Sequence, residues 1–318
     1  MSQVLIQNPV VLDQFDAILD KIADRFDAGD SSNQLMSDLF EAANAAVSEG
    51  GEHIVPELRE LATDHRVARY VYQCPFTTHS RDKPRGYAGD AHLIDYIYGH
   101  PDAMGRPDLA STVGQRIMVH NLESPAAAAV RARRTIIGMK VEEAVERMRR
   151  PRILSVACGN SRELELLQPE VLDKIGEFIG FDQDARSLAT TESHGRGGKP
   201  IHVVQGTIVD LMRTTEPSGF DLVYAAGLFD YLSDRLCRRL TKSLVARLNP
   251  GGRLLLANFL PDIRDVGYME TFMHWTLIYR DRAQIMDFVG DVAGEDIARL
   301  HYFMEPNRNI GFLEVVKA

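Results

Sequence analysis

The chain has 318 residues, of which 45% are hydrophobic and 25% are charged. These proportions exclude a disordered or low-complexity chain and are typical of a globular protein. Lysine and arginine number 36 against 45 aspartate and glutamate residues, a formal net charge of -9. This acidic balance argues against a general binder of nucleic acid or of anionic membranes, which must neutralise phosphates.

Cysteine usage and the absence of apolar runs bear on location. Three cysteines, Cys74, Cys158 and Cys237, are too few and odd in number for a disulfide framework. No apolar run approaches the ~20 residues of a membrane span. The first residues lack the basic and apolar regions of a signal peptide. We therefore expect a cytoplasmic protein without a membrane or nucleic-acid partner.

Up to Pro151, apolar residues recur mostly at helical spacing. The residues Cys74–Asp90 differ, because they carry two prolines and two glycines and are predicted to form an irregular loop. Thr112–Met148 is predicted as two helices that break near Ser124-Pro125. Other helices are predicted over Val11–Phe26, Leu35–Ala46 with a stop at Gly50-Gly51, Val55–Tyr72 and Asp90–Tyr98.

After Pro151, short apolar strands alternate with helical stretches such as Arg162–Leu167 and Asp234–Leu248, which predicts an α/β fold with a doubly wound sheet. The last two strands are joined by only Glu305–Asn309, whereas a parallel crossover needs a dozen or more residues. The seven-stranded sheet should therefore end with one antiparallel strand. The strands are predicted at Arg152–Ala157, Glu177–Phe181, Ile201–Val204, Phe220–Ala225, Arg253–Asn258, Ile297–Met304 and Ile310–Val316.

The change at Pro151, from helical spacing to alternating strands and helices, predicts three segments. Residues 1–110 form an N-terminal helical domain or lid, residues 111–150 are connecting helices, and residues 151–318 form the sheet domain. Within the sheet domain, the insertion 259–282 is predicted to cap the strand ends.

Ligands of open α/β sheets lie beyond the carboxyl ends of the strands. Small residues there let a ligand approach the backbone closely, and a carboxylate accepts hydrogen bonds from a ribose diol. A dinucleotide fingerprint would need glycine where this chain has Ala157 and Arg162. The residues after the first four strands are Ala157, Gly159 and Ser161, then Asp182 and Gln183, then Gly206 and Thr207, then Ala225 and Gly227.

Four stretches, residues 153–161, 179–182, 220–225 and 248–256, together with the terminal strand, resemble class I S-adenosylmethionine-dependent methyltransferases, which share a Rossmann-like sheet. The resemblance implies S-adenosyl-L-methionine as cofactor. It places Ala157, Gly159 and Ser161 along the methionine part, Asp182 with the following Gln183 at the ribose, Gly206 and Thr207 at the adenine, and Ala225 and Gly227 under the sulfonium.

One departure from that family affects the amino-acid end of the cofactor. The usual acidic residue at the end of the first strand is Ser155 here, and the usual first glycine of the loop is Ala157. Contacts to the cofactor's amino group are therefore expected from elsewhere. An arginine of the basic stretch before Pro151, with Arg133 as the candidate, is expected to bind the cofactor carboxylate, because arginine forks suit carboxylates.

A narrower resemblance involves the stretch Pro84–Asp90, together with Ser155–Gly159 and the Arg162-Glu163 pair. This combination resembles the bacterial 3-hydroxypalmitic acid methyl ester biosynthesis group of methyltransferases. It implies a carboxylate oxygen as the methyl acceptor and draws attention to Tyr87 and Asp90.

Several residues are candidates for binding the methyl acceptor, and the role of Trp275 and Tyr279 has two interpretations. At helical spacing Trp275 and Tyr279 would share one face, either as a pocket wall or as a helix packed on the sheet. Asp90, Asp230 and Glu305 would instead suit a cationic acceptor. The candidate catalytic residues are Tyr87, Asp90, Tyr231 and His274, and the candidate substrate-binding residues are Tyr87, Asp90, Phe229, His274, Trp275, Tyr279 and Arg280.

The predicted function is transfer of a methyl group to a small molecule, at a carboxylate oxygen or at an amino or guanidino nitrogen. A non-catalytic module that binds the cofactor and a nicotinamide-dependent oxidoreductase are the alternatives. The histidines and cysteines show no metal-ligand spacing, so no metal is expected. The N-terminal helices leave a homodimer open.

Overall fold

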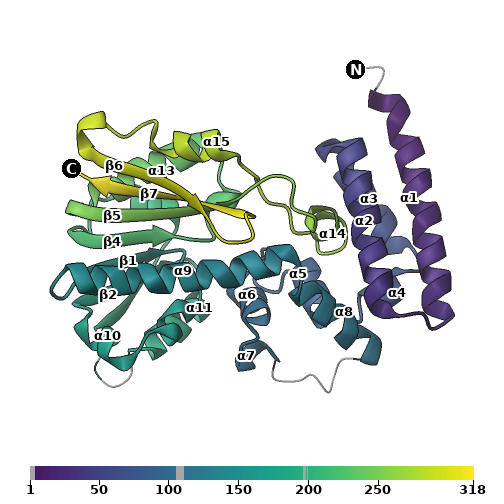
Figure 1. Cartoon of the computed structure of the whole chain (residues 1–318), viewed down its shortest axis with the longest axis horizontal. Coiled ribbons are helices and arrows are strands. Elements are labelled where there is room, and N and C mark those ends of the chain that lie inside the picture. Colours follow the sequence, from purple (N-terminus) through teal and green to yellow (C-terminus); the bar gives the residue numbers. More distant parts are fainter. Residues whose placement is uncertain (1–3, 105–110, 196–197, 199) are drawn as a thin grey trace. The chain divides into compact units, whose positions relative to one another are not determined.

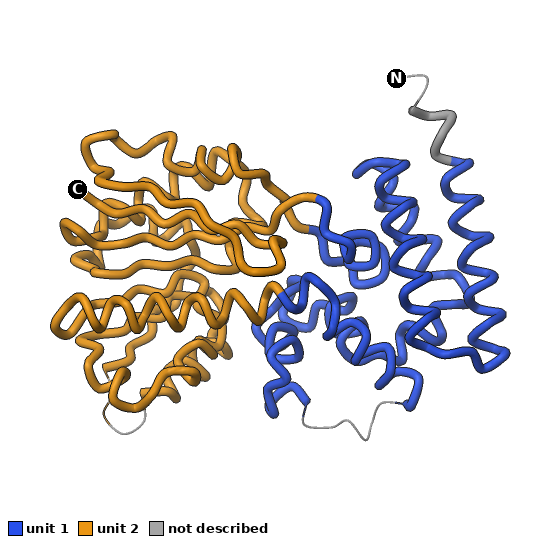
Figure 2. Tube along the Cα trace, in the orientation of Figure 1, with its two compact units in different colours: residues 1–128, 262–276 blue, residues 129–261, 277–318 orange. Residues whose placement is uncertain are grey.

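The computed structural model describes residues 4–104, 111–195, 198 and 200–318. The chain forms two compact units, one of residues 1–128 and 262–276 and the other of residues 129–261 and 277–318 (Figure 2). The excursion 262–276 thus leaves the second unit after Pro261 and returns to it at Leu277. None of the helices in the described ranges is long and apolar enough to cross a membrane.

The second unit contains a seven-stranded sheet in the order β3-β2-β1-β4-β5-β7-β6 (Figure 1). Strand β7 is antiparallel to both β5 and β6, and the other neighbouring pairs are parallel. This confirms the predicted fold class and the antiparallel last strand. The strands are β1 (Arg152–Val156), β2 (Glu177–Asp182), β3 (Ile201–Gln205), β4 (Phe220–Ala225), β5 (Leu248–Phe259), β6 (Ile297–Met304) and β7 (Ile310–Lys317).

The two faces of the sheet are covered differently. Leu313 and Val315 of β7 belong to the main core cluster together with Leu240 of α13. Glu314, which lies between them, points to the other face and forms an ion pair with Lys140 of α9. Helices α9 and α13 therefore lie on opposite faces (Figure 1). Besides α9 (Pro125–Arg147), which begins in the first unit, the helical elements of this unit are η3 (Arg162–Leu166), α10 (Pro169–Lys174), α11 (Ala185–Ser193), α12 (Ile208–Arg213), η4 (Phe229–Tyr231), α13 (Asp234–Ala246), α15 (Arg282–Met286), η5 (Asp287–Val289) and η6 (Gly294–Asp296).

The first unit is helical within its described residues. Helix α14 of the excursion packs on α2, and Gly267 makes that approach possible, because a Cβ atom there would overlap the backbone of Ala43 and Asn44. The helical elements are α1 (Val4–Asp27), α2 (Ser32–Gly50), η1 (Glu52–Ile54), α3 (Val55–Asp64), α4 (Ala68–Val71), α5 (Pro75–Asp82), α6 (Ala91–Tyr98), α7 (Pro101–Met104), α8 (Thr112–Leu122) and α14 (Val266–Thr271).

One helix prediction and one loop prediction in this unit are wrong. Val55–Tyr72 is not one helix, because His65 adopts an extended conformation after α3 and its Nδ1 accepts the Val67 amide at 3.0 Å. The segment Cys74–Asp90 is not wholly irregular, because Pro75 begins helix α5 and the left-handed Lys83 ends it. The break near Ser124-Pro125 is confirmed, since α8 ends at Leu122 and α9 begins at Pro125.

The predicted helix through Trp275 and Tyr279 is also wrong. Residues 274–280 have no regular secondary structure, and His274 has a φ of 51°, a left-handed value that ends any helical continuation of α14. Trp275 and Tyr279 therefore do not share a helix face.

We expect Gly267→Ala to destabilise the first unit by about 1–3 kcal/mol or more, because the added methyl group meets backbone that has no rotamer to change. Trp275, the only tryptophan, lies in the same unit, so urea unfolding followed by tryptophan fluorescence measures this change. The matched control is Gly294→Ala, where nothing lies within 4 Å of the added methyl group. Equal unfolding midpoints for the two variants would contradict the prediction.

Candidate cofactor site

The loop after β1 has an unusual backbone. Ala157, Gly159 and Ser161 have φ values of 52°, 53° and 47°. Only the middle one is glycine, and each of the others costs roughly 1–3 kcal/mol, a kind of strain that clusters at functional sites. Ala157, which stands where a glycine was expected, thus adopts a conformation that glycine favours. The loop is held at its start by the Cys158 amide, which donates to the Phe181 carbonyl at 3.1 Å.

Asp182 connects this loop to the end of β2. Its side chain is only 7% exposed. One carboxylate oxygen accepts the Gly159 amide at 2.9 Å and the other accepts the Asp184 amide at 2.9 Å. A carboxylate has about four acceptor positions, so these two bonds orient it and leave positions for hydroxyl donors.

The end of β3 lies next to Asp182. The Gly206 amide donates to the Asp182 carbonyl at 3.0 Å, and Gln205 Nε2 donates to the Gln183 carbonyl at 3.2 Å. A Cβ atom at Gly206 would lie 2.9 Å from the Phe181 ring, so a side chain there would have to displace that ring. Thr207 caps α12 in a reciprocal capping box with Asp210, which explains its residue type without a ligand.

Gly227, beyond the end of β4, lies against the side chain of Arg133 from α9. A Cβ atom at Gly227 would be 3.5 Å from a guanidinium nitrogen. Arg133 is only 7% exposed, and its guanidinium makes no hydrogen bond or ion pair with the residues that the structure describes. A carboxylate is the best-matched partner of such a guanidinium.

Asp230 follows in the short helix η4 and is 2% exposed. Its Oδ1 accepts the Phe259 amide at 2.7 Å. Burial raises the pKa of Asp230 to about 6, against the opposing effects of the Arg133 charge and of the Phe259 hydrogen bond. The carboxyl group therefore changes its charge close to neutral pH.

These groups fit the chemistry of an adenosyl amino acid. Asp182 offers an oriented carboxylate for a diol, Gly206 and Gly227 have no side chain, and Arg133 offers an unpaired cation for a carboxylate. The predicted cofactor residues that follow β1, β2, β3 and β4, with Arg133, all lie in the second unit.

Comparisons with known proteins bear on the fold and on the class of domain. Residues 153–252 match the family described as a methyltransferase domain. A possible exported protein from Bordetella parapertussis is similar to this chain at 19% identity, with a TM-score of 0.59 over 86% of this chain and 96% of its own. None of the curated proteins matches the chain.

Two methyltransferase structures are more distant. Magnesium protoporphyrin IX methyltransferase from Synechocystis PCC 6803, with bound S-adenosylhomocysteine, is 14% identical with a TM-score of 0.45 over 60% of this chain and 85% of its own. The N-methyltransferase NodS from Bradyrhizobium japonicum WM9 is 12% identical with a TM-score of 0.41 over 58% of this chain and 94% of its own.

Residues 153–252 therefore lie in a class I methyltransferase domain. The chain therefore contains a methyltransferase domain, within a sheet of the strand order β3-β2-β1-β4-β5-β7-β6.

Two of the residues predicted to bind the methyl acceptor already contact other residues within the fold. Phe229 is fully buried in the core and packs on Phe288, with ring centroids 4.9 Å apart. Arg280, 1% exposed, donates to the Phe229 carbonyl at 2.9 Å, to Asn258 Oδ1 at 2.8 Å and to Asp234 Oδ1 at 2.9 Å. These contacts favour a structural role for both residues over the predicted contact with the acceptor.

Asp90 also has an evident structural role in the first unit. It is fully buried, and its Oδ1 accepts the Leu93 amide at 2.8 Å as the N-cap of α6. His79 Nε2 lies 2.9 and 3.0 Å from its two oxygens. Burial alone would raise the pKa of Asp90, but the His79 and Leu93 hydrogen bonds outweigh it and lower the pKa. Tyr87 is half-buried in the turn that precedes this cap.

The remaining acceptor candidates differ in exposure. His274 is half-buried, and burial lowers its pKa to about 4, with smaller contributions from nearby cations. Its Nε2 lies 3.4 Å from Thr63 Oγ1. Trp275 is buried, Tyr279 is half-buried, and Tyr231 of η4 is exposed. His274 is therefore a neutral imidazole at physiological pH.

Sequence reasoning did not identify Glu163, after the loop that follows β1, as a buried acid. Glu163 accepts a hydrogen bond from Tyr224 at 2.6 Å, and burial raises the pKa of its carboxyl. Tyr224 lies in the middle of an apolar strand and Glu163 in a charged stretch, so only the fold brings them together. A polar residue inside the pattern of a buried strand is the one local indication.

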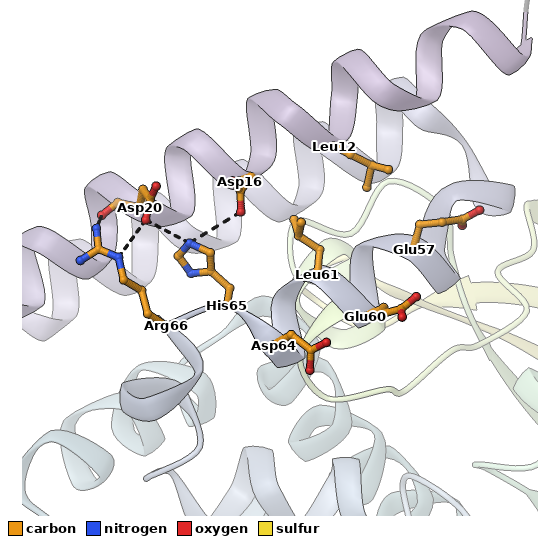
Figure 3. Close-up of a pocket in the computed structure, with 9 residues that line it drawn as sticks. All are labelled: Leu12, Asp16, Asp20, Glu57, Glu60, Leu61, Asp64, His65 and Arg66. Atoms are coloured by element: carbon orange, nitrogen blue, oxygen red, sulfur yellow. Dashed lines mark hydrogen bonds and ion pairs between the residues drawn. The ribbon is translucent and has the colours of Figure 1, made fainter.

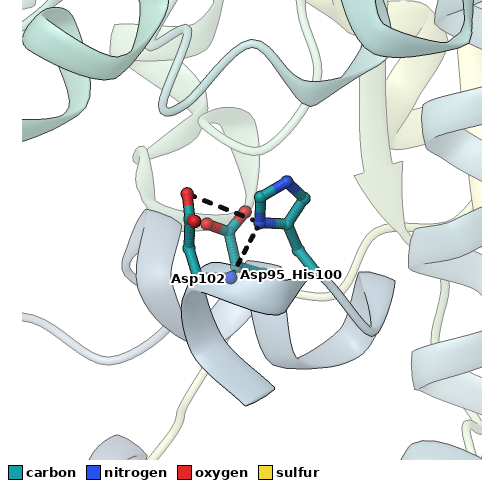
Figure 4. A group of neighbouring side chains, drawn as sticks. All are labelled: Asp95, His100 and Asp102. Atoms are coloured by element: carbon teal, nitrogen blue, oxygen red, sulfur yellow. Dashed lines mark hydrogen bonds and ion pairs between the residues drawn. The ribbon is translucent and has the colours of Figure 1, made fainter. Parts of the chain in front are cut away.

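Two further groups of charged residues lie in the first unit. An open groove of about 680 Å³ between α1 and α3 is lined by Leu12, Asp16, Asp20, Glu57, Glu60, Leu61, Asp64, His65 and Arg66 (Figure 3). Asp95, His100 and Asp102 bring one potential ligand atom each within 4.8 Å (Figure 4). The Asp102 amide already donates to His100 Nδ1 at 3.2 Å, which occupies the lone pair that a metal would need.

We expect Asp182→Ala to weaken binding of S-adenosylhomocysteine about 10–100-fold, because charge-assisted hydrogen bonds contribute about 1.5–3 kcal/mol. Asp182→Asn, which keeps one acceptor oxygen, should lie between this variant and the wild type. Isothermal titration calorimetry measures the dissociation constants, and circular dichroism checks that both variants fold. Unchanged affinity in folded Asp182→Ala would refute the assignment of the ribose to Asp182.

Proposed function

We propose that the chain methylates a small molecule at a carboxylate oxygen. The observation that carries the cofactor half of this proposal is the unpaired, buried Arg133 beside Gly227. When bound, S-adenosylmethionine supplies an activated methyl group on its sulfonium sulfur. Ala157, Gly159 and Ser161 would line its methionine part, Asp182 and Gln183 its ribose, Gly206 and Thr207 its adenine, and Ala225 and Gly227 its sulfur.

The choice of a carboxylate as the methyl acceptor depends on whether the site needs a general base. A general base is needed only when the acceptor arrives protonated and is a weak acid. Asp230, a buried carboxyl three residues after Gly227, accepts the Phe259 amide at 2.7 Å. A carboxylate acceptor arrives deprotonated and needs no such base. The chain then has to hold the acceptor in line and exclude water.

A nitrogen acceptor is the second candidate, and charge favours it. The chain has a net charge of -9, and five of the nine residues lining the groove of Figure 3 are carboxylates. Such a field attracts an amine or guanidine. Tyr87, His274 and Tyr231 stay candidates for acceptor contacts under either proposal.

The three buried cysteines, none of which forms a disulfide, support our further proposal of a reducing, cytoplasmic location.

We expect Arg133→Met to weaken binding of S-adenosylhomocysteine about 10–100-fold, since methionine keeps the bulk of the side chain and removes the charge. Binding of 5′-methylthioadenosine, which has the nucleoside and the sulfur but no carboxylate, should be unchanged. Arg149→Met, at an exposed position just after α9, is the control. Equal losses for both ligands would show that Arg133 supports the fold of the site and does not bind the carboxylate.

The acceptor atom can be read from the stability of the product. The enzyme is incubated with methyl-tritiated S-adenosylmethionine and a set of small carboxylic acids and amines, and the products are then treated with alkali. A methyl ester releases volatile labelled methanol, which is the expected result. Label that resists alkali identifies a nitrogen acceptor. Cofactor binding without any transfer across the set would favour the non-catalytic module.

A further inference from the structure

Glu163 is a buried acid with a single hydrogen-bond donor from the rest of the protein. It lies in η3, two residues after the left-handed Ser161, and is 7% exposed. Its Oε1 accepts the hydroxyl of Tyr224 in β4 at 2.6 Å. No other residue in the described ranges donates a hydrogen bond to this carboxylate or forms an ion pair with it. A carboxylate has about four acceptor positions, so most of its positions remain available to a ligand.

The other buried acids of the second unit have partners that account for them. Each accepts a backbone amide from another residue or forms an ion pair. Asp182 accepts the Gly159 amide, Asp221 the Arg152 amide, Asp230 the Phe259 amide and Glu305 the Asn307 and Asn309 amides, and Glu314 pairs with Lys140 and Arg253. Within the described part of the chain, Glu163 has neither kind of partner.

The contact with Tyr224 places the Glu163 carboxyl beside the neighbouring strands β1 and β4. Tyr224 is the register partner of Ser155, so the two side chains stand on the same face of the sheet. Each strand ends at the next residue, β1 at Val156 and β4 at Ala225. Ligands of open α/β sheets bind at this carboxyl edge. Since Ser155 carries no charge, Glu163 supplies the negative charge at this point of the edge.

Hydrogen bonds join η3 to the helix that carries Arg133. The next residue of α9, Arg134, donates to the Arg162 carbonyl from Nε at 2.9 Å and from Nη2 at 2.6 Å. Arg133 and Glu163 are therefore the chain neighbours of two residues that are hydrogen-bonded to each other. An α-amino acid carries an ammonium group and a carboxylate on one carbon atom, so a site for it needs an anion and a cation close together.

We propose that Glu163 binds the ammonium group at the amino-acid end of the cofactor, and that the Tyr224 hydroxyl positions its carboxylate for this contact. The inference rests on the proposed function, because it takes the adenosyl amino acid as the ligand. Arg133 then holds the carboxylate of the same amino acid. The ammonium group supplies the donors that Glu163 lacks within the described chain. Its charge also opposes the burial that raises the pKa of this carboxyl in the free protein.

The test is calorimetric titration of the full chain with four ligands. S-Adenosylhomocysteine has both charged groups, its decarboxylated analogue keeps only the ammonium group, its deaminated analogue keeps only the carboxylate, and 5′-methylthioadenosine has neither. Glu163→Gln removes the charge and keeps an oxygen for the Tyr224 hydroxyl. It should weaken binding of the two ligands with an ammonium group about 10–100-fold and should not weaken binding of the other two.

Two further variants separate binding from structure. Glu170→Gln makes the same chemical change at an exposed position of α10 and should bind all four ligands like the wild type. Tyr224→Phe keeps the Glu163 carboxyl but removes the hydroxyl that orients it, so it should lose affinity several-fold for the two ligands with an ammonium group. Circular dichroism checks that each variant folds. If Glu163→Gln does not fold, the pattern of Tyr224→Phe decides the matter.

Two results would overturn the proposal while leaving the proposed function intact. One is a folded Glu163→Gln variant that binds all four ligands like the wild type. The other is an equal loss for all four, which would show that Glu163 supports the loop and does not bind the ammonium group. Failure of the proposed function looks different, because the wild-type chain would then bind none of the four ligands.

Discussion

The carboxyl edge of the sheet depends on one buried guanidinium, that of Arg280. It donates to the Phe229 carbonyl in η4, to the Asn258 side chain in β5 and to Asp234 at the start of α13. Asn258 in turn donates to the Ile278 carbonyl at 2.9 Å. Removing one partner of such a buried, hydrogen-bonded charge costs about 3–5 kcal/mol. This network fixes the ends of β4 and β5 and the returning chain as one structure.

The loop after β1 holds a strained backbone through its contacts with β2. Ala157 and Ser161 have left-handed φ values, and the loop between them is fixed by the hydrogen bond from Gly159 to Asp182. Asp182 therefore has two functions that depend on each other: it orders the loop, and it presents the remaining acceptor positions of its carboxylate. A strained loop persists only where the surrounding structure over-determines it.

The sequence predicts the sheet well because each strand is a short apolar run between turn residues, and that pattern is local. The first unit is predicted less well, since its helix boundaries depend on single side chains: the His65 ring binds the Val67 amide, and Lys83 ends α5 in a left-handed conformation. Arg280 illustrates the remaining gap. A charged residue that follows a tyrosine, in a stretch that also holds the only tryptophan, resembles a binding residue in sequence, and only the tertiary fold shows that its donors are already occupied.

Arg280, Arg247 and Arg133, all buried in the second unit, differ in whether the protein itself supplies acceptors for their guanidinium groups. Arg280 is surrounded by acceptors, and the fully buried Arg247 donates to the carbonyls of Leu211, Thr214 and Pro217. Arg133 is nearly as buried and has no such acceptor among the described residues. An arginine without a protein partner is available to a ligand, and this is the basis of the proposed contact with the cofactor carboxylate. The neighbouring Asp230 carboxyl accepts the Phe259 amide, and burial raises its pKa to about 6.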